Sequence, residues 1–250
     1  MKRRTPLVGA TETRRSLGLS ESEPIDIFRV LRYVEEISIV RCPFGDSSSM
    51  SGLFVKKCGV RLMVINTERS WGHQIFTAAH ELYHVKYNEG MSGSLCHVAT
   101  FSDRLPEEYD ADKFAANLLV PTSGLEYMIE KEFGDTRLGF PEIIYLEQYF
   151  MVSHKAMLWR LQEIGRLTNR ERMQLSDGVK FKARELGYST RLYEKTLDHE
   201  IMSDLPRKVR EALERELISE GRAQEYLLSF GHDGWEEGGF AGNNDENMDE

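Results

Sequence analysis

The stretch Phe76–His84 constrains this chain most, because it holds two histidines four positions apart with a glutamate directly after the first. Residues i and i+4 of a helix share one face, so His80 and His84 can offer two imidazoles to one metal ion. Glu81 lies about 100° around the helix, beside such an ion, where a carboxylate can accept a proton from water. The spacing predicts the chemistry of a zinc-dependent peptide hydrolase. The alternative is an exposed amphipathic helix with two incidental histidines.

A catalytic zinc ion needs a third protein ligand and an open position for water. Glu108 is the best candidate, because it begins a predicted helix over 106–120 whose other face is small and apolar. Asp112 shares the face of Glu108 and can bind the outer ring nitrogen of a metal-bound histidine. His97 remains the rival ligand, and a solvated acidic helix start is the alternative interpretation of the carboxylates. The full set of candidates is His73, His97, Glu107, Glu108, Asp110 and Asp112.

The hydrophobic pattern predicts an α+β fold with a small, mostly antiparallel sheet and a helical metal-binding core, followed by a helical C-terminal region. Strands are expected at 37–40, 52–55 and 60–66, and helices at 5–19, 24–34, 71–87, 106–120, 122–133 and from 141 onward. We expect a catalytic core over 1–135 and a helical region over 136–230. Residues 231–250 hold seven acidic residues and no Lys or Arg, which predicts a disordered acidic tail.

Composition narrows the class of protein. The net charge of −9 argues against a protein whose main task is to coat nucleic acid. The three cysteines are scattered, as expected of reduced thiols in a cytoplasmic protein. The sequence has no apolar run of about 18 residues and no apolar segment after its basic N-terminus, so we expect neither a membrane span nor a signal peptide.

The motif pair also resembles a known family. The stretch Phe76–His84, followed by Glu108-x-x-Ala111-Asp112-x-Phe114 and Leu118-Leu119-Val120-Pro121, is similar to the pattern F-T-x-A-H-E-x-x-H and E-x-x-A-(N/D)-x-F-A-x-x-L-L-x-P of the ImmA/IrrE-type metallopeptidases. The resemblance implies a gluzincin-like (zincin-like) core with His80, His84 and Glu108 as metal ligands, Glu81 as catalytic acid/base and Asp112 as their supporting carboxylate. It further implies a protein substrate, namely a separately encoded helix–turn–helix transcriptional repressor whose cleavage derepresses genes. The expected metal is Zn²⁺, and Mn²⁺ also suits a donor set of two histidines and one glutamate.

A second hypothesis is a DNA-binding or protein-interaction module with a vestigial or regulatory metal site. It rests on helix–turn–helix spacing over 141–165 and on residues 151–195, where ten basic and five acidic residues give a local charge of +5. The same segment could instead recruit the repressor. Tyr109, Tyr149 and His154 are candidate donors to the oxyanion. A strand near 50–53 is a candidate site for a substrate bound by strand addition.

Overall fold

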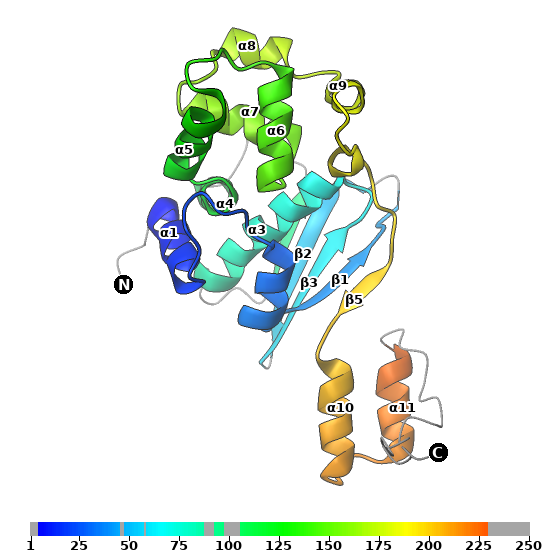
Figure 1. Cartoon of the computed structure of the whole chain (residues 1–250). Coiled ribbons are helices and arrows are strands. Elements are labelled where there is room, and N and C mark those ends of the chain that lie inside the picture. Colours follow the sequence, from blue (N-terminus) through cyan, green and yellow to red (C-terminus); the bar gives the residue numbers. More distant parts are fainter. Residues whose placement is uncertain (1–4, 46–47, 58, 88–92, 98–105, 230–250) are drawn as a thin grey trace, which may run out of the picture. The chain divides into compact units, whose positions relative to one another are not determined.

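The computed structural model describes residues 5–45, 48–57, 59–87, 93–97 and 106–229. The chain forms two compact units, residues 1–202 and residues 203–250 (Figure 1). The boundary predicted after residue 135 falls within the first unit, whose hydrophobic cluster includes residues from Ala10 to Leu167. The predicted acidic tail lies outside the described residues. Among the helices that the structure describes, we find none with the length and apolar character that a membrane crossing requires.

The first unit contains a five-stranded sheet in the order β4-β2-β3-β1-β5. Its strands are β1 (Ser38–Cys42), β2 (Met50–Lys57), β3 (Val60–Asn66), β4 (Gly93–His97) and β5 (Glu200–Met202). The β1–β3 pair is parallel, while β2–β3, β2–β4 and β1–β5 are antiparallel. The predicted α+β class with a small, mostly antiparallel sheet is therefore confirmed. Strand β5 lies within the predicted helical region over 136–230, where no strand was expected.

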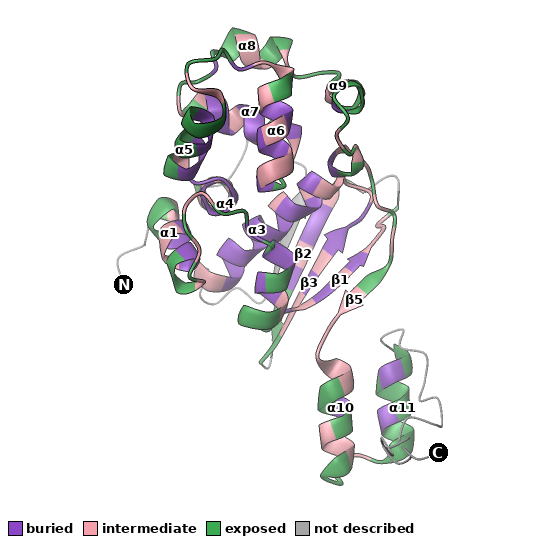
Figure 2. Ribbon diagram, in the orientation of Figure 1, coloured by how far each residue is buried: buried purple, intermediate pink, exposed green. Residues whose placement is uncertain are grey.

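Helix α3 (Trp71–Tyr87) packs on the sheet, with contacts to β2 and β3. Figure 2 shows the buried residues gathered where this helix and the strands meet. Gly52 of β2 permits the close approach, because a Cβ atom there would lie 2.8 Å from Cγ2 of Thr77 and 3.0 Å from the carbonyl oxygen of Val64. Ile39, Phe54 and Met63 of the sheet share one cluster with Ala79 and Leu82 of the helix. Burial on this face fixes the predicted metal helix against the sheet.

Helix α4 (Pro106–Leu119) lies against α3, and helix α1 (Pro6–Ser16) lies against α4. Pro106 suits the first turn of a helix, and Pro121 prevents its continuation. The ring of Phe114 lies 5.6 Å from that of Tyr83 and 5.7 Å from that of Tyr87. The buried alanines of α4 let its backbone come near α3. The two helices are thus held in a fixed relation, which sets the positions of the candidate site residues.

The other elements of the first unit are mostly short helices. They are α2 (Ile27–Arg29), the π-helix η1 (Val30–Val34), α5 (Thr122–Phe133), α6 (Phe140–Phe150), α7 (His154–Glu163), α8 (Asn169–Gln174), α9 (Val179–Glu185) and the 3-10 helix η2 (Arg191–Tyr193). The side chain of Ser153 accepts a hydrogen bond from the backbone of Ala156, and this cap starts α7.

The second unit contains helices α10 (Leu205–Glu214) and α11 (Glu220–Ser229). Its cluster of buried residues consists of Val209, Ala223 and Leu227. A core of this size adds little stability. Burial of a large apolar side chain contributes about 1.5–3 kcal/mol, and this gain is offset by the conformational entropy lost when the two helices become ordered.

Candidate metal centre

Helix α3 carries three of the predicted site residues at its buried centre. His80, Glu81 and His84 are 3%, 0% and 1% exposed. The helix starts at Trp71, and the carbonyl of Ser70 accepts hydrogen bonds from the backbone of His73 and Gln74. The spacing of four residues places both imidazoles on the side that faces α4.

Glu108 of α4 completes a cluster of possible metal donors. Nε2 of His80 lies 3.1 Å from Nε2 of His84 and 3.1 Å from Oε2 of Glu108. Nε2 of His84 lies 3.4 Å from Oε1 of Glu108. The three residues each offer one ligand atom, and these atoms lie within 4.8 Å of one another. No other such group of three or more His, Cys, Asp or Glu residues occurs in the part of the chain that the structure describes.

The chemistry and spacing of these donors fit a metal ion. Two imidazole nitrogens and one carboxylate oxygen are a common set for catalytic zinc, with an open position for water. Tetrahedral bonds of about 2.0–2.1 Å place neighbouring donors about 3.3 Å apart, close to the three separations of 3.1, 3.1 and 3.4 Å. Manganese accepts imidazole and carboxylate ligands as well. The residues present therefore fit a divalent ion of either kind.

Asp112 lies on the outer side of His80, one helical turn after Glu108. Its Oδ1 is 3.0 Å from Nδ1 of His80, and its side chain is 10% exposed. When Nδ1 of His80 carries the proton, it donates a hydrogen bond to this carboxylate. Nε2 is then unprotonated, and its lone pair points toward His84 and Glu108. Asp112 thus lies where a carboxylate can set the tautomer and the orientation of the ring.

His84 is held in a neutral form. Burial lowers its pKa, the neighbouring His80 lowers it further, and Glu108 opposes both, so that the pKa of His84 falls to about 4. The ring of Phe54 stacks on it at 6.4 Å with an interplanar angle of 13°. A neutral imidazole is the form that binds a metal ion, so His84 needs to lose no proton for binding near neutral pH.

The exchange of Asp112 for alanine tests its role. We expect Asp112→Ala to bind metal about 10–100-fold more weakly, because the outer nitrogen of His80 loses the acceptor that orients the ring. Asp112→Asn is the matched control, since an amide oxygen can accept the same hydrogen bond. Metal affinity is measured by competition with a chromophoric chelator. Equal affinity of the alanine variant and the wild type would contradict the assignment, as would equal losses in both variants.

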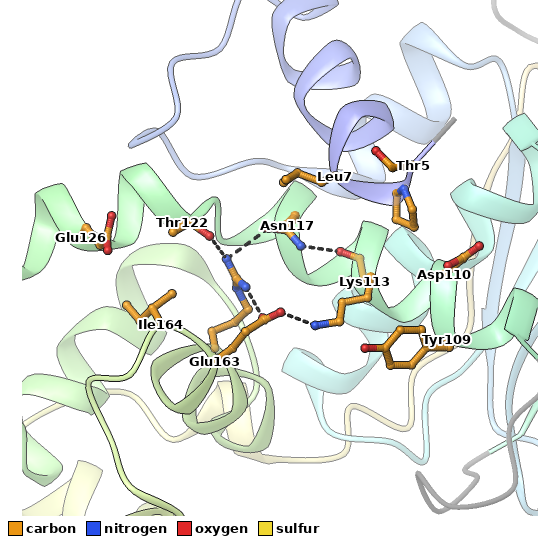
Figure 3. Close-up of a pocket in the computed structure, with 12 residues that line it drawn as sticks. Thr5, Leu7, Tyr109, Asp110, Lys113, Asn117, Thr122, Glu126, Glu163 and Ile164 are labelled. Atoms are coloured by element: carbon orange, nitrogen blue, oxygen red, sulfur yellow. Dashed lines mark hydrogen bonds and ion pairs between the residues drawn. The ribbon is translucent and has the colours of Figure 1, made fainter. Parts of the chain in front are cut away.

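The other candidate ligands do not join this cluster in the described structure. Nε2 of His73 lies 2.9 Å from Oγ of Ser51. Glu107 is exposed in the first turn of α4, and Asp110 lines a groove beside another face of that helix (Figure 3). His97 belongs to β4, but its side chain is outside the described structure.

The predicted substrate-binding strand needs correction. Strand β2, which holds residues 50–53, pairs with β3 on one side and with β4 on the other. Its backbone groups are used by these partners, so it cannot take up a further strand. The sequence pattern missed this because the partner β4 follows the metal helix rather than preceding it. Among the described strands, β4 is the one at this edge of the sheet.

His154, a candidate oxyanion donor, is engaged in a separate buried network. Its Nδ1 lies 2.5 Å from Oε1 of Glu147, and its Nε2 donates to the carbonyl oxygen of Leu175 at 2.6 Å. The hydroxyl of Tyr193 donates to Oε2 of Glu147 at 2.7 Å. Both ring nitrogens are therefore occupied. His154 links α7 to α6 and to the end of α8, and Glu147 extends the network to Tyr193 of η2. Of the other candidates, Tyr149 stacks on Tyr145 and Tyr109 is half-exposed beside Glu108.

This network predicts a pH-dependent stability. Burial lowers the pKa of His154, but the hydrogen bond and charge of Glu147 outweigh it and raise the pKa above 6.5. Because the pKa of His154 is higher in the folded than in the unfolded protein, its protonation stabilises the fold. This stabilisation is fully present below the pKa of the unfolded state, about 6.5, and it is lost as pH rises through the pKa of the folded state. We expect the melting temperature of the wild type to fall more steeply than that of His154→Gln between pH 6 and 9. His199→Gln, which removes an exposed histidine, is the control. Parallel profiles for wild type and His154→Gln would refute the prediction.

The predicted helix–turn–helix segment is largely buried. Helices α6 and α7 place Ile143, Leu146, Phe150, Met157 and Leu161 in the main hydrophobic cluster. Part of the basic charge of 151–195 is also used internally: Arg160 is 2% exposed, Lys180 pairs with Glu194, and Lys182 pairs with Glu185. The segment thus serves packing, and its part in DNA or partner binding stays a prediction.

Comparison with known proteins agrees with this arrangement. Residues 34–162, about half of the 250 residues, match the family model of Peptidase M78, described as the IrrE N-terminal-like domain. The chain belongs to this family. The IrrE-like region includes α3, α4 and the candidate metal donors, and membership places the chain in a metallopeptidase family linked to transcriptional regulation.

One similar solved structure is a Mycobacterium tuberculosis transcriptional regulator. It is 16% identical to the chain with a TM-score of 0.44, and the match covers 67% of this chain and 48% of that one. The chain thus spans about half the length of that regulator. No curated protein matches the sequence.

Proposed function

We propose that this IrrE-like chain is a metal-dependent endopeptidase that cuts a regulatory protein, and that its substrate is a separately encoded helix–turn–helix transcriptional repressor. The observation that carries the proposal is the cluster of His80, His84 and Glu108, with ligand atoms 3.1–3.4 Å apart. The family supports a protein substrate. The substrate class rests on the resemblance of the two motifs to ImmA/IrrE-type peptidases. A cytoplasmic location follows from such a substrate and from the scattered cysteines.

In this mechanism His80, His84 and Glu108 would hold the metal ion. When bound, the metal lowers the pKa of a water molecule and polarises the carbonyl of the scissile peptide. Glu81 follows His80 on the same helix and accepts the proton of the attacking water. It then donates that proton to the nitrogen of the leaving amine, so one carboxylate acts first as base and then as acid. Asp112 keeps the Nδ1 proton on His80.

Burial strengthens this chemistry. Glu81, His80 and His84 lie in a region from which bulk water is largely excluded. Charge interactions are stronger there than in water, and side chains packed between α3, α4 and the sheet need little rearrangement before reaction. The site is therefore suited to hold its proton acceptor in one orientation.

The direct test uses a repressor encoded by a neighbouring gene. The purified, metal-loaded protein is incubated with that repressor, and the products are measured by intact-mass spectrometry. We expect two fragments whose masses sum to that of the repressor plus one water, and no fragments after chelation of the metal. A metal-loaded protein that leaves every helix–turn–helix repressor offered to it intact would contradict the proposed substrate class.

A further inference from the structure

Helix α11 of the second unit exposes apolar side chains that the unit itself does not bury. Its Ala223 and Leu227 are 1% and 8% exposed and share a small cluster with Val209 of α10. The next residue, Leu228, is 54% exposed. Leu217, in the connection between the two helices, is 71% exposed. The described part of this unit therefore has more apolar surface outside its core than two helices of this size usually leave in water.

Leu228 belongs to an uncharged stripe along α11. At about 100° per residue, Gly221, Gln224 and Leu228 lie within about 60° of one another around the helix axis. All three residues are exposed. The middle of this α11 stripe lies about 110° from the side that carries Ala223 and Leu227. Helix α11 thus has one apolar side against α10 and a second uncharged side that faces away from it.

Gly221 is not required by the packing of its own chain. A Cβ atom at this position would have no heavy atom within 4 Å beyond its own helical turn. Glycine lowers the stability of a helix by about 0.5–1 kcal/mol relative to alanine. Glycine is useful where another backbone or side chain comes close. The open space at Gly221 therefore suits contact with a group from outside this unit.

The α11 stripe is complementary to itself. When two α11 helices pack antiparallel around a two-fold axis beside Gln224, Gly221 of each copy lies opposite Leu228 of the other. Each leucine then fills the space that a glycine leaves. The two Gln224 amides meet near the axis, where each can donate a hydrogen bond to the other. A parallel pair would instead place leucine opposite leucine and glycine opposite glycine.

The charges of this unit also permit contact between two copies in the antiparallel arrangement. Residues 203–229 hold six acidic and five basic residues, a net charge of −1. Beside the stripe, Arg222 pairs with Glu225 of the same copy at 2.7 Å. Residues 231–250 add seven acidic residues and no Lys or Arg. In an antiparallel pair these acidic segments begin at opposite ends of the two helices, about 15 Å apart, which limits their repulsion.

We propose that the α11 stripe binds the same stripe of a second copy of this chain, antiparallel, with Leu228 of each copy against Gly221 of the other. The contact covers apolar surface that the three buried residues of the unit leave exposed. It is only one helix wide, well below the usual size of a stable interface, so we expect a dissociation constant of about 10–100 µM. The inference does not depend on the metal centre or on peptidase activity.

The test is sedimentation equilibrium of the full-length protein from about 5 to 500 µM. We expect the mean mass to rise from that of one chain toward that of two. Leu228→Lys should weaken association about tenfold or more, because it puts a charge into the apolar contact. Gly221→Leu should weaken it similarly by filling the space for the leucine of the other copy. Leucine favours a helix more than glycine does and has open space in its own chain, so the hairpin should stay folded.

Tyr226→Lys is the matched control. Tyr226 is 38% exposed on the same helix, about 170° from the stripe, and the exchange adds the same charge as Leu228→Lys. It should associate like the wild type. A mean mass that stays at one chain throughout, whatever else covers the stripe, would overturn the proposal. An unchanged association of Gly221→Leu, or an equal loss in Tyr226→Lys and Leu228→Lys, would overturn it as well.

The antiparallel arrangement is tested by disulfide formation. An equimolar mixture of the full-length variants Gly221→Cys and Leu228→Cys is oxidised mildly at about 200 µM, and linked peptides are identified by mass spectrometry. Wild type, with its three cysteines, gives the background. We expect links between positions 221 and 228 of different copies. Links of 221 to 221 and of 228 to 228 in place of these would show a parallel pair and contradict the proposed contact.

Discussion

The exchange Glu81→Gln is expected to slow repressor cleavage about 10²–10⁴-fold, the usual contribution of a general acid and base. Glutamine has nearly the same shape but can neither accept the proton of the attacking water nor donate it to the leaving amine. Glu81 is fully buried, so a substitution of equal size is needed to preserve the packing of α3. The rate is measured under single-turnover conditions with enzyme in excess, which separates the chemical step from product release.

The metal content of Glu81→Gln serves as the control. Glu81 is not one of the three donors, so the variant should hold one equivalent of metal, as the wild type does, measured by mass spectrometry of the released ion. A variant that retains metal and cleaves at the wild-type rate would remove Glu81 from the mechanism. A variant that loses its metal would instead make Glu81 part of the binding site.

The exchange Glu108→Ala is expected to weaken metal binding more than about 100-fold. Loss of a residue that only supports a ligand lowers metal affinity about 10–100-fold, and loss of a ligand itself should lower metal affinity further. The side chain of Glu108 is 30% exposed, so its truncation leaves no large buried cavity and the fold should persist. Cleavage should fall with metal occupancy.

Glu107→Ala is the matched variant, because Glu107 precedes Glu108 in the same helical turn and is exposed. It should bind metal with wild-type affinity. Metal affinity is determined by chelator competition, and circular dichroism confirms the fold of both variants. Equal affinities of Glu108→Ala and wild type would show that the third donor lies elsewhere, and His97 would then be the next candidate.

Local patterns sufficed for the elements that carry the candidate site. The spacing of His80 and His84 and that of Glu108 and Asp112 follow from the helical period, and both stretches form helices in the structure. Pro106 is the first residue of α4, Pro121 follows its end, and Ser153 directly precedes α7, all positions that these residue types favour. These signals lie within a few residues of what they predict, so they can be interpreted without knowledge of the tertiary fold.

Contacts between distant residues could not be predicted in this way. Tyr193 donates a hydrogen bond to Glu147, which lies 46 positions away in the sequence, and Lys113 pairs with Glu163, which lies 50 positions away. Neither sequence separation follows a helix or strand period, so neither contact could be predicted. The edge of the sheet was misassigned for the same reason, since β4 pairs with β2 across the whole of α3. In the sequence alone, a buried and paired glutamate such as Glu147 cannot be distinguished from an exposed one.

We propose that the metal centre of this IrrE-like chain cuts a regulatory protein. The most direct measurement compares the new protein amino termini in cells that express the wild type with those in cells that express Glu81→Gln at the same level. We expect wild-type cells to contain additional termini within a helix–turn–helix repressor, together with loss of the intact repressor. Identical sets of termini in the two cell populations, with both proteins metal-loaded, would rule out this peptidase activity in cells.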